Sequence, residues 1–260
     1  MAKSVEQSTR EFYDERGWKG GEDRLFRQFS PAYRQYHAAA VARTIDCFSG
    51  RNGSLLIAGG GDMPDSHIDI ATKFDRVACI DISQAALDIA QRKVPKVEPT
   101  LGSICAAPFD ASTFDAVLCA HVIYHIDATE QERAVRELIR ICKPGGRVVI
   151  LYKNPQSPIR YAAGAIHRLR KLAAPKEAIE EAAGLYFSAH SLAWWKRFKD
   201  TSAVSMRPWD IIGSFEERTL IPANGLARSF YGIAGWIEVK TPRLAVKFWQ
   251  YPIVILDKPS

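Results

Sequence analysis

Three consecutive glycines at residues 59–61 are followed, 22 residues after the first, by an acidic residue, Asp81. Glycine permits tight turns and lets a ligand approach the backbone closely. In dinucleotide-binding folds, a carboxylate about 20 residues after such a turn holds the ribose diol. Gly59, Gly60, Gly61 and Asp81 therefore predict a site for a nucleotide-like ligand, although the full G-x-G-x-x-G pattern is absent.

His121 and His125 are the side chains in the central part of the chain best suited to proton transfer. Histidine changes its charge near neutral pH, so it can act as a base. A spacing of four residues also suits a metal site on a helix, but no acidic or cysteine partner is evident. The sequence therefore predicts acid–base chemistry here and no metal.

Short apolar runs alternating with helical segments position these residues. The expected strands are 54–58, 76–81, 114–120 and 147–152, and the expected helices are 83–93 and 129–141. Apolar strands that alternate with helices form parallel sheets covered on both faces. The predicted fold class is α/β, a Rossmann-like doubly wound sheet. Ligands bind such sheets beyond the carboxyl ends of the strands, where the glycines and Asp81 fall.

The pattern divides the chain into four regions. Residues 1–50 are expected to form an N-terminal helical cap, and residues 51–153 the ligand-binding core. Residues 154–250 become mainly helical, basic and aromatic, which indicates a substrate cap or lid inserted after the fifth strand. Residues 251–260 contain a final strand that we expect to return to the core sheet.

The core resembles the class I S-adenosylmethionine (SAM)-dependent methyltransferases, in particular the small-molecule type-11 group. The matching stretches occur in that family's order and spacing: LLIAGGG (55–61), CIDIS (79–83), APFDASTFD (107–115), VLCAHVIYH (117–125) and LIRICKPGG (138–146). The resemblance implies a seven-stranded sheet whose last strand, matched here by 251–256, is antiparallel. It also implies SAM as the cofactor and S-adenosylhomocysteine as the product.

By position, the resemblance assigns a cofactor-binding role to each of several residues. The backbone at Gly59, Gly60 and Gly61 would pass beside the methionine part of SAM, and Asp81 would accept hydrogen bonds from both ribose hydroxyls. The remaining assignments are Ile82 packed on the adenine, Ser103 and Ile104 at the adenine edge, Ala120 beneath the sulfonium, and Tyr13 closing over the cofactor.

Three positions depart from the family pattern. The family often has an acidic residue where Ile57 stands, another where Ser103 stands, and a glycine where Met63 stands. Ser103 still offers a hydroxyl to the adenine amino group, whereas Ile57 removes a usual anchor for the glycine loop or for the amino group of SAM. These departures keep a non-catalytic SAM-binding interaction protein open as an alternative.

Methyl transfer requires the nucleophile, the methyl group and the sulfur in line, and a base if the nucleophile carries a proton. The resemblance places His121 near the methyl, so we predict that His121 is this base or orients the acceptor. His125 is more typical of a residue that bonds the backbone. The expected reaction is O- or N-methylation of a small molecule.

The cap is basic, with nine Lys or Arg against four Asp or Glu in residues 153–200. On a helix, Arg160, His167, Arg168 and Lys171 fall within about one face, and residues 194–195 are expected to add a wall of two tryptophans. We predict a lid that admits an acceptor with an apolar or aromatic body and an anionic group. The basic charge also leaves an RNA or tRNA methyltransferase open, although a large cap suits a small-molecule pocket better than nucleic acid.

No apolar run is long enough to cross a bilayer, and the N-terminus has no apolar signal core. Five scattered cysteines, never in a C-x-x-C pair, are typical of reduced, buried thiols. The chain is therefore expected to be cytoplasmic, with no membrane span, and the sequence sets no oligomeric state.

Overall fold

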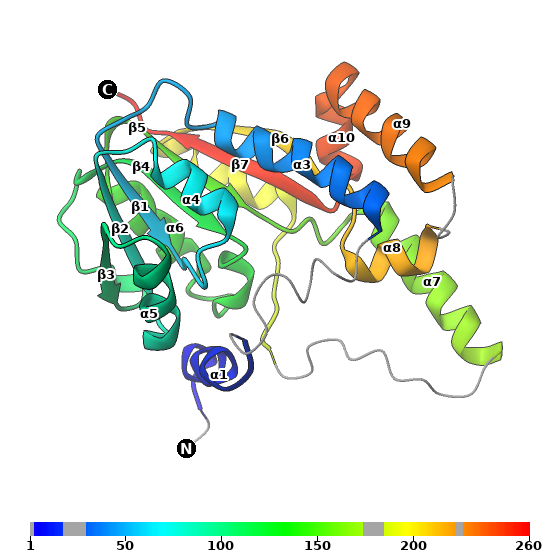
Figure 1. Cartoon of the computed structure of the whole chain (residues 1–260), viewed down its shortest axis with the longest axis horizontal. Coiled ribbons are helices and arrows are strands. Elements are labelled where there is room, and N and C mark those ends of the chain that lie inside the picture. The colour runs from blue at the N-terminus through cyan, green and yellow to red at the C-terminus, as the bar shows by residue number, and fades with distance from the viewer. Residues whose placement is uncertain (1–2, 18–29, 174–184, 222–225) are drawn as a thin grey trace.

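A computed structural model describes residues 3–17, 30–173, 185–221 and 226–260. Seven strands form one sheet in the order β3-β2-β1-β4-β5-β7-β6, in which β7 runs antiparallel to β5 and β6 (Figure 1). The strands are β1 (Ser54–Ala58), β2 (Arg76–Asp81), β3 (Val97–Leu101), β4 (Phe114–Ala120), β5 (Cys142–Leu151), β6 (Ala203–Asp210) and β7 (Tyr251–Asp257). The predicted doubly wound α/β fold and the antiparallel last strand are thus confirmed.

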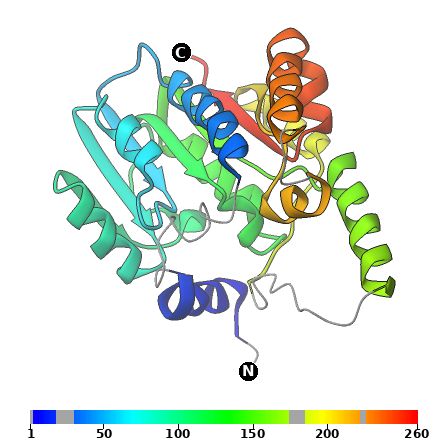
Figure 2. The same cartoon turned by 45° about the vertical axis from the view of Figure 1, so that its right-hand side comes forward.

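Helices cover both faces of this sheet (Figures 1 and 2). The longer helices are α1 (Val5–Phe12), α3 (Pro31–Asp46), α4 (Asp65–Ala71), α5 (Gln84–Lys93), α6 (Gln131–Ile141), α7 (Pro158–Ala173), α8 (Ser214–Leu220), α9 (Leu226–Lys240) and α10 (Pro242–Phe248). Short turns of 3₁₀ or π type are η1 (Tyr13–Gly17), η2 (Ile104–Ala106), η3 (Ile123–His125) and η4 (Leu192–Asp200).

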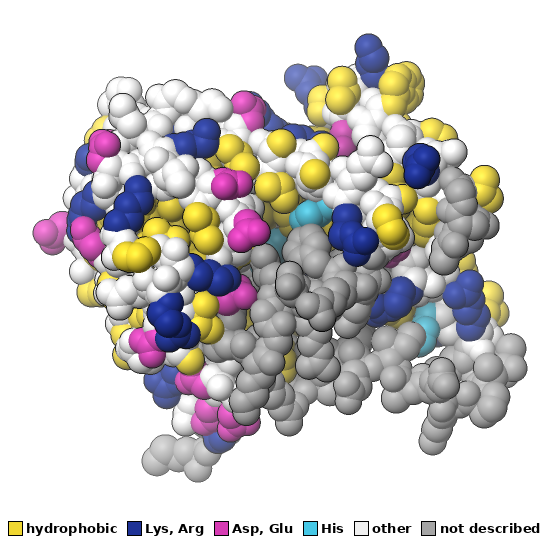
Figure 3. Space-filling view, viewed as in Figure 1, with side chains coloured by type: hydrophobic (Ala, Val, Ile, Leu, Met, Phe, Trp, Pro, Cys, Tyr) yellow, Lys and Arg dark blue, Asp and Glu magenta, His cyan; other side chains and the backbone are white. Residues whose placement is uncertain are grey.

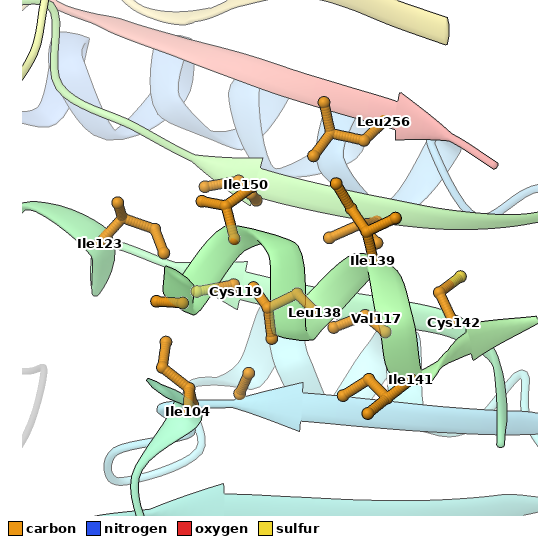
Figure 4. Close-up of a cluster of buried hydrophobic side chains, with 14 of the residues drawn as sticks. Ile104, Val117, Cys119, Ile123, Leu138, Ile139, Ile141, Cys142, Ile150 and Leu256 are labelled. Carbon is orange, nitrogen blue, oxygen red and sulfur yellow. The ribbon is translucent and has the colours of Figure 1, made fainter. Parts of the chain in front are cut away.

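Two apolar layers hold the sheet between its helices. Successive residues of a strand point to opposite faces, so a strand covered on both sides is apolar throughout. Val117 and Ile150 pack with Leu138 and Ile139 of α6 in one layer (Figure 4). Leu118 belongs to the other layer, which α3, α4 and α5 complete. The alternation read in the sequence therefore corresponds to two buried faces.

The sequence analysis did not predict the two edge strands, β3 and β6. Both contain polar side chains and a proline: Glu98 and Pro99 in β3, Arg207 and Pro208 in β6. Edge strands tolerate such residues because one side of their hydrogen-bonding ladder has no neighbour in the sheet. Strand β6 comes from residues 154–250, and helices α7 to α10 of that region lie beside the same end of the sheet (Figure 2).

Asp115 joins the beginnings of the central strands. Its carboxylate accepts hydrogen bonds from the backbone N–H of Ser54 at 2.8 Å, the Ser54 hydroxyl at 2.7 Å and Lys143 Nζ at 2.8 Å. Partial burial disfavours the charged form, but the hydrogen bonds from Lys143 and Ser54 outweigh it and lower the pKa of Asp115 to about 2. The ionised carboxylate therefore stabilises the register of β1 against β4.

We expect Asp115→Asn to lower the free energy of unfolding by about 1–2 kcal/mol, since a charged acceptor is lost at a partly solvated site. The folded-state pKa lies below the unfolded value of about 3.9, so the contribution is complete above about pH 4 and is lost as the pH falls towards 2. Urea unfolding at several pH values should show the wild type and Asp115→Asn converging in acid. The exposed control Asp110→Asn should match the wild type throughout; a constant gap between wild type and Asp115→Asn would contradict the assignment.

Candidate active site

A cavity of about 1480 Å³ opens beyond the carboxyl ends of β1, β2 and β4. Its position is the switch point of the sheet, because β2 and β4 flank β1 on opposite sides. All of the predicted site residues line this one cavity: Tyr13, Gly59, Gly60, Gly61, Asp81, Ile82, Ser103, Ile104, Ala120, His121 and His125. The topology therefore brings together residues that are up to 112 positions apart, from Tyr13 to His125.

The glycine loop leaves no room for side chains. Gly59 and Gly61 have φ angles of 71° and 55°, in the left-handed region that glycine adopts readily. A Cβ on Gly59 would overlap Val122 Cγ2, and a Cβ on Gly60 would overlap the sulfur of Cys79. Backbone alone therefore forms this wall, which suits a ligand that must approach closely.

Asp81 ends β2 and is 9% exposed. Its two oxygens accept hydrogen bonds from Gly61 N at 3.1 Å and from Ser83 N at 2.9 Å. Burial raises the pKa of Asp81, and these backbone hydrogen bonds oppose that effect. A carboxylate has about four acceptor positions, so the group still has capacity for a ribose diol. The loop and Asp81 together fit the adenosyl half of SAM.

Helix α1 and the turn η1 lie across this part of the cavity. Ser103 Oγ donates to Glu6 at 2.5 Å, Ser83 Oγ donates to Asp14 at 2.5 Å, and Tyr13 lines the cavity near Asp81. Burial, reinforced by the charge of Asp81, raises the pKa of Tyr13 to about 12. The phenol is therefore neutral, and the N-terminal helix is bonded to two loops that carry predicted cofactor residues.

The positions that depart from the family pattern have structural roles. Ile57 is buried beneath the glycine loop, and Met63 is fully buried despite a φ of 52°. Ser103 bonds Glu6, so a carboxylate stands beside the position at which the family often has its own acidic residue. The sequence analysis missed Glu6, because only the packing of α1 places it there.

His121 lies past the end of β4 with a φ of 62°. Its Nδ1 is 2.9 Å from the Tyr124 hydroxyl, and its ring packs against Trp209 and Tyr251, with centroids 4.9 and 5.6 Å away. Burial, and secondarily His67 and His125, lower the pKa of His121 to about 3. The ring is therefore neutral at physiological pH.

His125 is oriented by the backbone. Its Nδ1 lies 2.8 Å from the carbonyl oxygen of Tyr186, which can only accept, so Nδ1 carries the hydrogen. Burial lowers the pKa of His125, and the bond to Tyr186 opposes this effect. The contact matches the backbone-bonding role that is typical of a histidine at this position.

A second polar cluster, not predicted from the sequence, lines the cavity opposite the glycine loop. Asp210 ends β6, is 1% exposed, and accepts from the Tyr33 hydroxyl at 2.5 Å. His37 Nδ1 lies 2.8 Å from the same oxygen of Asp210. In the sequence, the one signal of this cluster is the four-residue spacing of Tyr33 and His37, which places both on one face of α3. Asp210 is 173 positions from His37, so the sequence does not connect it with them.

A smaller cavity of about 710 Å³ adjoins the first and shares Gly213, Ser214 and Tyr251 with it. Lys153, Arg160 and Arg168 line it. Lys153 Nζ and Arg160 Cζ lie 5.1 and 5.6 Å from the centroid of the Phe187 ring. Two cations thus flank one aromatic ring beside the main cavity.

The predicted aromatic wall of the lid is corrected by the structure. Trp194 and Trp195 belong to η4, are buried with Phe198 in the core layer and line neither cavity. The aromatic residues that line the basic cavity are instead Tyr161, Phe187, Phe215 and Tyr251. His167 packs on Phe215 with ring centroids 5.4 Å apart.

Within the described part of the chain, no group of three or more His, Cys, Asp or Glu residues is arranged to hold a metal ion. None of the described helices is long and apolar enough to cross a membrane.

Comparison with known proteins shows what the core of this chain is similar to. Residues 58–150 match the family described as "Methyltransferase domain". A ubiquinone/menaquinone biosynthesis C-methyltransferase, UbiE of Escherichia fergusonii, is 31% identical over 117 residues, which cover 42% of this chain and 46% of the relative. The UbiE of Klebsiella pneumoniae is 32% identical over the same length. The chain thus spans about half the length of the curated relatives it matches.

Solved structures share the fold across nearly the whole chain. Geranyl diphosphate C-methyltransferase of Streptomyces coelicolor has a TM-score of 0.59 at 16% identity, covering 99% of this chain and 98% of that one. The N-methyltransferase NodS of Bradyrhizobium japonicum has a TM-score of 0.56 at 13% identity, covering 99% and 100%. These likenesses establish the fold.

We expect Asp81→Ala to weaken the binding of S-adenosylhomocysteine at least tenfold, since hydrogen bonds to a charged group contribute about 1.5–3 kcal/mol each. Isothermal titration calorimetry measures the dissociation constant directly. The control Asp88→Ala removes an exposed carboxylate from α5 and should leave it unchanged. Equal affinities of wild type and Asp81→Ala would remove Asp81 from the cofactor site.

Proposed function

We propose that this chain, whose residues 58–150 match a methyltransferase domain, is a class I SAM-dependent methyltransferase that transfers a methyl group from SAM to a small organic acceptor. The observation that carries the proposal is the convergence of the glycine loop, Asp81 and His121 on one cavity at the switch point of the sheet. The adenosyl half would lie against Asp81, and the acceptor would lie between His121 and Asp210.

The residues on the Asp81 side fit the cofactor. Asp81 would hold the ribose diol, and Ile82 and Ile104 would provide apolar contacts for the adenine. Glu6, fixed by Ser103, would accept a hydrogen bond from the adenine amino group in place of the absent acidic residue. When bound, the cofactor supplies an electrophilic methyl group on a sulfonium.

The acceptor side offers two imidazoles for a proton of the nucleophile. His121 can take it at Nε2 if Nδ1 carries a hydrogen and donates it to the Tyr124 oxygen. His37 differs in having a buried carboxylate, Asp210, against its Nδ1. A carboxylate in this position fixes the ring and stabilises its protonated form, as in histidine-based catalysis generally. We assign His121 as the primary candidate because it lies next to Ala120, at the expected position of the sulfonium.

The acceptor is proposed to have an apolar or aromatic body and an anionic group. Trp209 and Tyr251 would contact the body, and Lys153 and Arg160 would bind the anion in the adjoining cavity. Tyr251 lies between the two, since its ring contacts His121 and also lies 5.6 Å from Lys153 Nζ. The similar proteins named above include C- and N-methyltransferases, so we add carbon to nitrogen and oxygen as proposed acceptor atoms.

We expect His121→Asn to lower the maximal rate by about 10²–10⁴-fold if His121 is the base. Asparagine tolerates the positive φ of this position, so the loop should keep its conformation. The measurement is release of S-adenosylhomocysteine from SAM in a panel of carboxylated and phosphorylated aromatic or prenyl acceptors. Because the pKa of His121 is about 3, the wild-type rate should show no loss from protonation of this ring between pH 5 and 8.

The matched variant is His37→Asn, with binding of S-adenosylhomocysteine measured for both proteins. If only His37→Asn loses activity, the proton acceptor is His37 and the assignment of His121 is wrong. If every acceptor gives background rates with the wild type while S-adenosylhomocysteine binds, the proposed acceptor class is wrong.

We expect Arg160→Ala to raise the KM for an anionic acceptor about tenfold, because one charged hydrogen bond contributes about 1.5–3 kcal/mol. The KM for SAM should not change. Arg170→Ala, on the same helix but outside both cavities, is the control. An unchanged acceptor KM at low salt would show that the basic cavity does not bind the acceptor.

A further inference from the structure

Helices α9 and α10 expose apolar side chains that line neither active-site cavity. Ile233 and Trp236 are each 61% exposed and Val239 is 75% exposed, all on α9. Leu244 and Phe248 on α10 are 49% and 41% exposed. A helix that is apolar around most of its circumference is normally covered by protein or lipid. Exposed apolar patches of this kind mark interaction surfaces.

The charges of these two helices are segregated. Residues 226–248 contain four basic residues, all exposed, and one acidic residue. The acidic residue, Glu238, is buried and bonded to Tyr36, Arg43 and Trp249. The exposed basic residues are Arg228, Lys240, Arg243 and Lys247. Figure 3 shows apolar and basic side chains side by side over α9 and α10, at the upper right.

The opposite side of α9 is firmly packed. Tyr231 and Ala234 are buried against Tyr33 and Tyr36 of α3, and Ala245 and Trp249 complete the same cluster. The rings of Tyr36 and Tyr231 stack with centroids 5.1 Å apart. The exposed face is therefore held in place by the fold and does not result from a loosely attached helix.

We propose that the exposed face of α9 and α10 docks this protein on an anionic lipid surface. Apolar residues including tryptophan, flanked by Lys and Arg without acidic residues, are what an interfacial helix presents to such a surface. Basic residues are attracted to anionic headgroups, and the apolar side chains enter the boundary beneath them. With 15 residues, α9 is shorter than the roughly 20 needed to span a bilayer, so it lies on the surface.

A second copy of the chain fits this face less well. A two-fold symmetric contact would bring the same four basic residues of both copies together without acidic partners. The buried side of α9 reaches the proposed acceptor side of the active site, since Tyr33 belongs to the α9 cluster and also lines the main cavity. Docking would thus hold that side near a membrane, from which an amphiphilic molecule can enter.

The test is sedimentation of the full chain with vesicles of phosphatidylcholine alone or mixed in equal parts with phosphatidylglycerol. The wild type should bind the anionic vesicles at least tenfold more strongly than the neutral ones, and added salt should weaken the binding. The double variant Ile233→Ser/Trp236→Ser should lose most of the binding. The triple variant Lys240→Glu/Arg243→Glu/Lys247→Glu should lose at least tenfold, because each basic residue near such a surface strengthens binding about fivefold.

The control Leu101→Ser removes a leucine that is 55% exposed on β3, at the opposite edge of the sheet, and should bind like the wild type. Thermal unfolding confirms that the variants fold. Equal vesicle binding by the wild type and both multiple variants overturns the proposal. A second result would also overturn it: analytical ultracentrifugation shows a wild-type dimer, the substitutions Ile233→Ser/Trp236→Ser dissociate that dimer, and neither protein binds vesicles. Binding of S-adenosylhomocysteine tests the proposed function separately, since the affinity for this ligand should be the same whether or not the protein binds vesicles.

Discussion

A hydrogen bond from the backbone of Gly61 to the carboxylate of Asp81 links the two loops on which the cofactor site depends. The preceding glycines, Gly59 and Gly60, pass so close to Val122 and Cys79 that side chains are excluded. Burial raises the pKa of Asp81, and hydrogen bonds from the backbone of Ser83 and Gly61 oppose that effect. The steric packing at the end of β1 and the electrostatics at the end of β2 therefore meet in this one hydrogen bond.

The other half of the cavity is built from segments distant in sequence. Strand β6 pairs with β7 at the edge of the sheet, and its last residue, Asp210, receives hydrogen bonds from α3. Helix α3 in turn packs against α9. The Asp210 side of the cavity therefore depends on an edge strand, whereas the Asp81 side depends on the centre of the sheet.

Burial is the common cause of the shifted pKa values in the cavity. It lowers the pKa of His67 to about 4 and that of His121 to about 3, and it raises the pKa of Tyr13 to about 12. All three groups are therefore neutral at physiological pH. Asp81 and Asp210 are the buried acidic residues of this cavity, and Lys153 and Arg160 line the adjoining one. This arrangement supports the proposed acceptor, whose apolar body would lie among neutral rings and whose anionic end would lie outside them.

The sequence by itself determined the parallel core and the predicted site residues that the structure brings to one cavity. Apolar strands followed by Gly59–Gly61, Asp81 and His121 are local signals, and parallel strands bring their carboxyl ends to one edge whatever the rest of the chain does. Only the tertiary structure decided the rest. Asp210 contacts His37 across 173 positions, and Glu6 contacts Ser103 across 97. Trp195 is packed in the core, although the pair of tryptophans at 194–195 was expected to form a wall of the lid. These contacts depend on how edge strands and peripheral helices pack, and hydrophobic periodicity specifies which face of an element is buried but not which distant element covers it.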